Sequence, residues 1–249
     1  MLNPRRFSAS SAPVAELERR TQWRAVAILA FLGILVGLAV VAVIPMIWPP
    51  ATLTGLPDDP DVSSAVRLVH DRLKFDATGL RFFSALLGDN SVGSPYDPSS
   101  ARLVGRAGAY LGRARTRHPR DARIAACLAS LDLLRGDVQR AVQRYRAVLD
   151  LGPSYGEGHL GLGVALTLEA AGQTNPLVER ALLLQAIGQF AAVGERDPVY
   201  EAALYNRAVL LVKVGRREEA RRLARRYFAR DTSSPWAGRL EWAVGMLGR

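Results

Sequence analysis

The stretch from Ala25 to Trp48 constrains this chain most, because its twenty-four residues include no charged, Asn, Gln or Ser side chain. A helix of this length measures ~36 Å, enough to cross the hydrocarbon core of a bilayer with some tilt. In lipid every backbone amide needs a partner within the segment, so we expect a helix. Trp23 and Trp48 stand at its ends, where amphipathic rings prefer the headgroup region. The sequence therefore predicts a single transmembrane helix over residues 25–48.

The charges on either side of this span predict its orientation. Residues 1–24 contain five arginines and two glutamates, whereas the twenty residues after the span contain three aspartates and one arginine. Arginine-rich flanks stay in the cytoplasm, so we expect a cytoplasmic tail over 1–24 and an extracytoplasmic remainder. The alternative is a cleaved signal peptide. It requires a shorter apolar core and a small-residue cleavage site, which residues 45–50 (PMIWPP) do not provide.

Inside the span, Gly33 and Gly37 form a small-residue pair at a four-residue spacing. Such a pair lets the backbones of two membrane helices approach closely, and the second helix is then another copy of this chain or that of a partner. Glycine is also common in membrane helices in general, so the alternative is a pair without a specific contact.

Composition narrows the classes of partner. The chain has 249 residues, a formal net charge of +10 and only two lysines among 33 basic residues, a bias typical of GC-rich bacterial genomes. We therefore expect the inner membrane of a bacterium, with the C-terminal part in the periplasm. A basic domain on that side favours anionic lipid headgroups or an acidic protein face as partners, and not nucleic acid. Cys127 has no second cysteine to pair with and lies in an apolar helical pattern, so we expect a buried thiol.

After the span, residues 49–60 contain four prolines and no apolar period, which predicts a semi-rigid linker. Apolar residues then recur at helical spacing, with Asp61 as the expected cap of the first helix: Val66, Val69, Leu73, Leu80, Phe83 and Leu87. Asp97 and Pro98 form a second helix start, because a capping side chain precedes a residue that needs no amide donor. We expect a helical segment over 61–118, and the sequence leaves open whether it is a diverged repeat.

From Pro119 onward the sequence shows a period. Pro119 and Pro153 are 34 residues apart, with two predicted helices and a Gly136–Asp137 turn between them, and Pro198 opens another unit. A 34-residue repeat of paired helices is typical of a helical solenoid. The units resemble the tetratricopeptide repeat (TPR) family at Leu128, Ala129, Gly136, Ala141, Tyr145, Pro153, Leu162, Gly163, Leu166, Ala186, Phe190, Leu204, Tyr205, Asn206, Ala208, Leu211, Gly215, Glu219 and Ala220.

The resemblance implies TPR-like repeats over residues 119–234 and a closing helix over 235–249, with Leu240, Trp242, Ala243 and Met246 facing inward. Two departures stand out. Pro153 and Pro198 are 45 residues apart, so the middle unit has longer helices. Asp132 and Arg207 occupy positions where the family prefers apolar residues, which predicts weaker packing or local polar contacts there.

Motifs for catalysis, a cofactor or a metal are missing from the sequence. The three histidines, His70, His118 and His159, are far apart and have no second ligand at helical spacing. Glycine-rich phosphate loops, nucleophile elbows and haem-attachment motifs are absent. We therefore predict no catalytic, cofactor-binding or metal-binding residue.

Two surfaces are candidates for binding. The TPR resemblance implies a concave groove that holds a partner's amphipathic helix or apolar segment, lined by Arg123, Ser130, Glu157, Leu160, Val164, Tyr205, Val209 and Val212. The alternative is that the chain's own segment 61–118 fills this groove. The second candidate is a basic stripe on the last repeat, comprising Arg221, Arg222 and Arg225, for which the alternative is an ordinary solvated helix face.

Together these features predict an all-α protein, with one N-terminal transmembrane helix followed by a TPR-like α-solenoid of helical hairpins. The expected function is that of a non-catalytic scaffold that binds, assembles or stabilises a membrane or periplasmic complex, such as a respiratory or photosynthetic one. The alternative is a periplasmic-side chaperone for secreted or cytochrome-maturation clients.

Overall fold

The computed structural model describes residues 55–70, 73, 79–89 and 100–245. All of them belong to one compact unit, Leu53–Arg249. The predicted span 25–48 with Gly33 and Gly37, the tail before it and residues 49–54 of the linker lie outside these ranges. Within the described ranges, no helix is both long and apolar enough to cross a bilayer.

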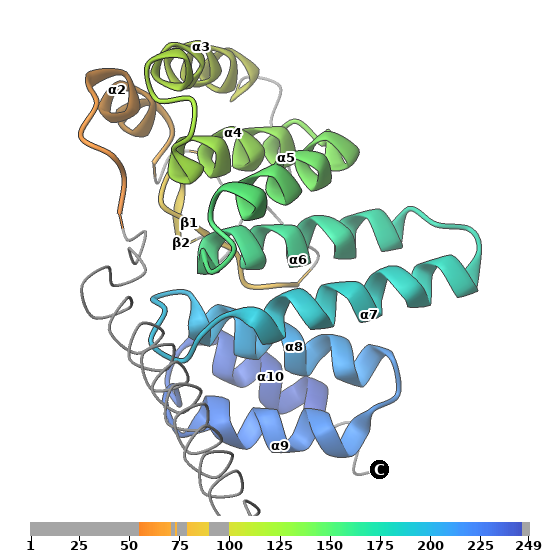
Figure 1. Ribbon diagram of the computed structural model, residues 1–249. Coiled ribbons are helices and arrows are strands. Elements are labelled where there is room, and N and C mark those ends of the chain that lie inside the picture. Colours follow the sequence, from red (N-terminus) through yellow and green to blue (C-terminus); the bar gives the residue numbers. More distant parts are fainter. Residues whose placement is uncertain (1–54, 71–72, 74–78, 90–99, 246–249) are drawn as a thin grey trace, which may run out of the picture. The chain divides into compact units, whose positions relative to one another are not determined.

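The described residues form nine helices and one two-stranded hairpin (Figure 1). In chain order they are α2 (Pro60–Val69), β1 (Phe83–Ser84), β2 (Gly88–Asp89), α3 (Ala101–Arg117), α4 (Ala122–Leu134), α5 (Val138–Leu151), α6 (Gly156–Ala171), α7 (Pro176–Ala192), α8 (Tyr200–Lys213), α9 (Arg217–Phe228) and α10 (Pro235–Gly245). The helices from α4 to α9 form the three pairs that the 34-residue period predicts.

Two of the three pairs turn in the same way, at a glycine. Gly136 follows α4 with φ 77°, and Gly215 follows α8 with φ 82°. Residues other than glycine rarely adopt this left-handed backbone conformation. In each turn the third residue after the helix donates its amide to a carbonyl of the last helical turn. The Asp137 amide bonds Asp132 O at 2.9 Å, and the Arg216 amide bonds Leu211 O at 2.8 Å. This closing pattern satisfies carbonyls that the helix end leaves free.

The helices lie in two layers. α4 contacts α6 and α6 contacts α8, so the first helices of the three pairs form an inner layer. α5, α7 and α9 each pack against these first helices and form the outer layer. At the two ends of the array, α2 packs on α3 and α3 on α4, while α10 packs on α8 and α9. Each pair therefore buries its apolar face against its neighbours, as in other solenoids.

The middle pair is the longest, with 16 residues in α6 and 17 in α7. Both helices extend beyond the neighbouring pairs in Figure 1. Two glycines of α6 allow its close packing: a Cβ at Gly161 would lie 2.2 Å from the ring of Tyr145, and one at Gly163 would lie 2.4 Å from the ring of Phe190. These distances leave no room for a side chain, so α6 packs with its backbone against both neighbours.

The helical prediction for Leu80, Phe83 and Leu87 is wrong. Residues 83–84 and 88–89 pair as antiparallel strands, with Phe83 opposite Asp89 and Ser84 opposite Gly88. From Leu80 to Ser84 burial follows a period of two, because Leu80, Phe82 and Ser84 are buried while Arg81 and Phe83 are half-buried. A turn follows at residues 85–87, where the Leu87 amide bonds Ser84 O at 3.0 Å and both Leu86 and Leu87 are buried. We call residues 79–89 the groove strand, for its position described below.

Helix α2 begins two residues earlier than predicted, with Asp59 as its cap in place of Asp61. Asp59 Oδ1 accepts from the amides of Asp61 at 2.8 Å and Val62 at 3.2 Å. The same carboxylate receives the Arg117 guanidinium of α3, which ties the two helices together. The predicted start at Asp97 lies outside the described residues, and α3 begins at Ala101.

The closing helix is rotated relative to the prediction. Trp236, Ala237 and Leu240 are buried, whereas Trp242 is 70% exposed. At 100° per residue Trp242 lies roughly 200° around the helix from Leu240, so both cannot face the array. Met246 lies outside the described residues.

Candidate functional site

The inner layer carries the groove strand, which bonds to one helix of each pair. Ser130 of α4, Glu157 of α6 and both Tyr205 and Asn206 of α8 supply side chains that contact it. Most of these contacts join a side chain of the array to the main chain of the groove strand. The concave face is therefore occupied by a segment of the same chain.

The Asn206 side chain forms hydrogen bonds with both the amide and the carbonyl of Arg81. Its Oδ1 accepts from the Arg81 amide at 2.7 Å, and its Nδ2 donates to the Arg81 carbonyl at 2.7 Å. Next to it, the Tyr205 hydroxyl donates to the Gly79 carbonyl at 3.1 Å. The Arg81 guanidinium donates to the Tyr227 hydroxyl at 3.3 Å and lies 3.7 Å from Asp231. α8 thus fixes one end of the groove strand.

Glu157 fixes the other end from α6. Its Oε1 accepts from the Ala85 amide at 3.0 Å, and its Oε2 accepts from the Tyr155 hydroxyl at 3.0 Å. The side chain is buried, and this burial raises the pKa of Glu157 to about 7. A buried carboxylate is costly unless hydrogen bonds compensate it, and these two donors do so in part.

A chain of hydroxyls continues the contact into α4 and α5. Ser84 Oγ lies 3.0 Å from Ser130 Oγ, which in turn lies 2.9 Å from the Tyr145 hydroxyl. Cys127 is also buried in α4, and its burial raises the pKa of the thiol well above its ordinary value. A thiol in this state is a weak nucleophile, which agrees with the expected structural role.

The structure places most of the predicted groove residues under the groove strand or in the core, not at a free surface. Five of the eight are buried: Ser130, Glu157, Leu160, Val164 and Tyr205. These five residues therefore do not line a free groove, and the alternative, that the chain's own 61–118 segment fills the groove, agrees with the position of residues 79–89. Of the remaining three, Arg123 pairs with Asp121 at 2.6 Å, and Val209 and Val212 are partly exposed.

One part of the concave face stays open. A cavity of about 690 Å³ lies between α8, α10 and the start of the groove strand, lined by Gly79, Tyr205, Val209, Pro235, Gly238, Arg239, Trp242 and Ala243. We call it the α8–α10 cavity. Its wall contains the exposed Trp242 and the half-buried Val209, and the Arg239 guanidinium stacks 4.8 Å above the Trp236 ring. Neither Trp242 nor Arg239 was among the predicted site residues, and Trp242 was expected on the inward face of the closing helix.

The predicted basic stripe carries charges of both signs. Arg221 pairs with Glu218, while Arg222 and Arg225 are exposed. The neighbouring arginines also have acidic partners, with Arg207 at 3.2 Å from Glu219 and Arg226 paired with Glu195.

The two departures from the family pattern, Arg207 and Asp132, make local polar contacts. Arg207 lies 3.2 Å from Glu219, and Asp132 lies 3.0 Å from Arg144.

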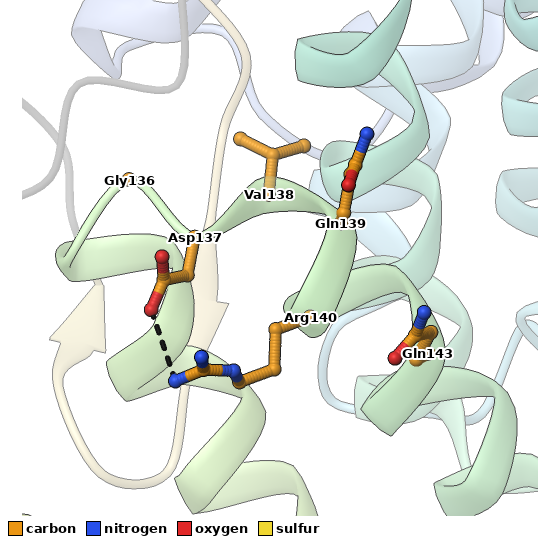
Figure 2. A pocket seen from close by; sticks show the side chains of 6 residues that line it. All are labelled: Gly136, Asp137, Val138, Gln139, Arg140 and Gln143. Atoms are coloured by element: carbon orange, nitrogen blue, oxygen red, sulfur yellow. Dashed lines mark ion pairs between the residues drawn. The ribbon is translucent and has the colours of Figure 1, made fainter.

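A second hollow, of about 430 Å³, lies at the α4–α5 turn (Figure 2). Figure 2 shows Asp137 and Arg140 turned toward each other, with Val138 and Gln139 directed away from them. The two charges are 3.1 Å apart and about half exposed, and none of the six lining residues is buried. Among the described residues no group of three or more His, Cys, Asp or Glu is arranged to hold a metal. We assign no site to this hollow.

The paired helices, their glycine turns and the two-layer stacking define a TPR-like α-solenoid. A crystal structure of a thermophilic TPR protein from Thermus thermophilus is similar, with a TM-score of 0.51 and 19% identity over 60% of this chain and 79% of that one. This likeness confirms the TPR-like fold. No protein-family model matches the chain, and no curated protein matches it.

Proposed function

We propose that this protein is a non-catalytic scaffold, anchored in the bacterial inner membrane by residues 25–48, that binds and stabilises a membrane or periplasmic protein complex. The TPR-like fold supports the binding role, and the apolar span and its arginine-rich flank support the location. An accessory subunit of a respiratory or photosynthetic assembly is one such role.

The observation that carries the proposal is the α8–α10 cavity. Its volume is in the range of pockets that bind small ligands, so it has room for side chains of a partner segment. An exposed tryptophan beside a half-buried valine is an apolar surface of the kind that partner proteins cover, and tryptophan and arginine are frequent at energetic centres of interfaces. Arg239 at the rim favours a partner segment that carries a carboxylate next to its apolar side chain.

The test is native purification of the full chain with its partners, compared between variants. Val209→Glu and Trp242→Ala alter the α8–α10 cavity, and Leu177→Glu is the control because Leu177 is equally apolar, 78% exposed and on α7. Burial of one apolar side chain contributes ~1.5–3 kcal/mol, so we expect at least tenfold weaker partner recovery for the first two variants only. Circular dichroism should show the same helix content in all three.

The recovered proteins also separate the scaffold from the chaperone. A scaffold yields one or a few partners in fixed ratio to the chain, and a chaperone yields many apolar clients in small and variable amounts. Loss of partners by Leu177→Glu alone would move the binding surface to α7 and contradict the proposal for the α8–α10 cavity.

A further inference from the structure

We propose that the groove strand is an intramolecular ligand of the concave face, and that a partner segment of the same extended type binds there by displacing it. This inference rests on the proposed scaffold function and adds how its binding face is regulated.

The groove strand is held as a foreign peptide would be, through its main chain. Asn206 pairs with the amide and the carbonyl of Arg81, and Glu157 accepts the amide of Ala85. Contacts of this kind do not depend on the side chain at the bonded position, so another extended segment makes them equally well. The Asn206 amide acts here as a neighbouring strand would, with one donor and one acceptor.

The side chains of the groove strand fill the face at every second position from Leu80 to Ser84, and Leu86 and Leu87 fill it from the turn that follows. Leu80, Phe82 and Leu86 are at most 3% exposed, and Ser84 between them bonds Ser130 at 3.0 Å. This pattern describes the partner class: a segment that is extended at the positions of residues 79–84, with apolar residues at alternate positions and a small hydroxyl residue at the place of Ser84, and that turns back at the positions of residues 85–87. The period of two excludes an amphipathic helix, the alternative ligand form, from this part of the face.

The helices of the array also contact one another directly, besides their contacts with the groove strand. α4 packs directly on α6 and α6 on α8, and the outer helices join the same pairs. In the described part of the chain, β1 pairs only with β2, so the strand belongs to no larger sheet. We therefore expect that opening of the strand uncovers the inner layer while these direct helix contacts remain.

Docking of the strand also has an opposing contribution. Docking orders the backbone of residues 79–89, which offsets part of the gain from apolar burial. The Glu157 carboxylate that accepts from the Ala85 amide is itself buried, and this burial raises its pKa, so its charged form is disfavoured at the contact. These unfavourable contributions offset part of the apolar burial that favours docking, so a competing segment can displace the strand.

The first test uses the unmodified full chain in detergent micelles. Amide hydrogen exchange of residues 79–89 is compared with that of residues 156–171 in α6. We expect exchange of the groove strand at least tenfold faster than that of α6, because it opens locally while the array stays folded. Exchange at the same rate as α6 would show a permanent part of the core and overturn the proposal.

The second test supplies the strand from outside. A fluorescent synthetic peptide with the sequence of residues 79–89 is added to the chain carrying Phe82→Ala and Leu86→Ala, which weaken its own strand. We expect at least tenfold tighter peptide binding than by the unmodified chain, because apparent affinity scales with the fraction of open sites. Adding Asn206→Ala should reduce this binding again by at least tenfold.

The control is Phe83→Ala, since Phe83 is the neighbouring aromatic that is only half-buried. It should bind the peptide no better than the unmodified chain. No peptide binding by a double variant that keeps its helix content would contradict the proposal, and if that variant unfolds, the exchange measurement decides. Neither test involves the unidentified partner, so their failure would leave the scaffold function and its α8–α10 cavity standing.

Discussion

Asn206 in α8 makes two hydrogen bonds of 2.7 Å to the main chain of Arg81, which lies 125 positions earlier in the sequence. One bond uses the Asn206 amide nitrogen and the other its oxygen, so the side chain replaces one residue of a neighbouring strand. The contact joins the segment before the repeats to the last repeat. It is the main polar link between the groove strand and α8.

Replacement of Asn206 should therefore destabilise the folded chain. Asn206 is fully buried, and Asn206→Ala leaves the amide and the carbonyl of Arg81 without these partners. We expect a loss of about 1–3 kcal/mol in the free energy of unfolding. Urea denaturation followed by circular dichroism measures it, with Gln173→Ala as the exposed control. A loss below about 0.5 kcal/mol, the size of ordinary surface effects, would contradict the prediction.

The buried Glu157 predicts a pH dependence of stability. Burial raises its pKa from 4.5 to about 7, so the folded state binds this proton more tightly than the unfolded state. Protonation therefore stabilises the fold: the contribution is complete below pH 4.5 and is lost as the pH rises toward about 7. The shift corresponds to about 3 kcal/mol.

Glu157→Gln tests this prediction because it keeps the shape and removes the titration. Unfolding free energies are measured for both chains from about pH 4 to about pH 8. The unmodified chain should lose stability relative to the variant across this range. Parallel curves would show that Glu157 is not the group responsible.

The glycines of α6 and α7 give a matched pair of substitutions. A Cβ at Gly163 would lie 2.4 Å from the Phe190 ring, whereas a Cβ at Gly188 would meet no atom within 4 Å. Gly163→Ala should therefore destabilise the fold by about 1–3 kcal/mol through overpacking. Gly188→Ala should be neutral or stabilise by up to ~1 kcal/mol, since alanine favours the helix. Thermal unfolding of the two variants checks the difference, and equal effects would argue against the close α6–α7 packing.

The arginine asymmetry around residues 25–48 predicts the topology of the chain in its membrane. Protease added to spheroplasts should digest the repeats and leave a protected fragment that ends within the linker 49–60. Immunoblotting with an N-terminal tag follows this fragment. If the repeats stay intact until detergent dissolves the membrane, the orientation is reversed and the partners are cytoplasmic.

The repeat region was predictable from the sequence because its signals are local. Gly136 and Gly215 mark the two tight turns, and Pro153 and Pro198 separate the pairs. The glycine at 163 was part of the family pattern, although its reason, contact with Phe190, appears only in the structure. Helices whose ends and apolar faces are coded within one turn of the chain are the elements that sequence periodicity detects well.

The groove strand was not predictable in the same way. Leu80, Phe83 and Leu87 fit a helical period, while Leu80, Phe82, Ser84 and Leu86 fit a period of two. A segment of eleven residues is too short for periodicity alone to choose between them. The choice depends on residues far away in the sequence. Glu157 accepts a hydrogen bond from the Ala85 amide, and Asn206 accepts from the Arg81 amide and donates to the Arg81 carbonyl.

By itself, the sequence determined the paired helices, their turns and the TPR-like class, because these depend on residues close together in the chain. It also carries the apolar stretch over 25–48, from which the membrane anchor is proposed. Only the tertiary structure decided what covers the concave face and which side of α10 is exposed. Those depend on contacts between residues far apart in the chain: Asn206 meets Arg81, and Trp236 rather than Trp242 packs against Tyr205. Such contacts form only when the array has assembled, since they join elements that share no local pattern.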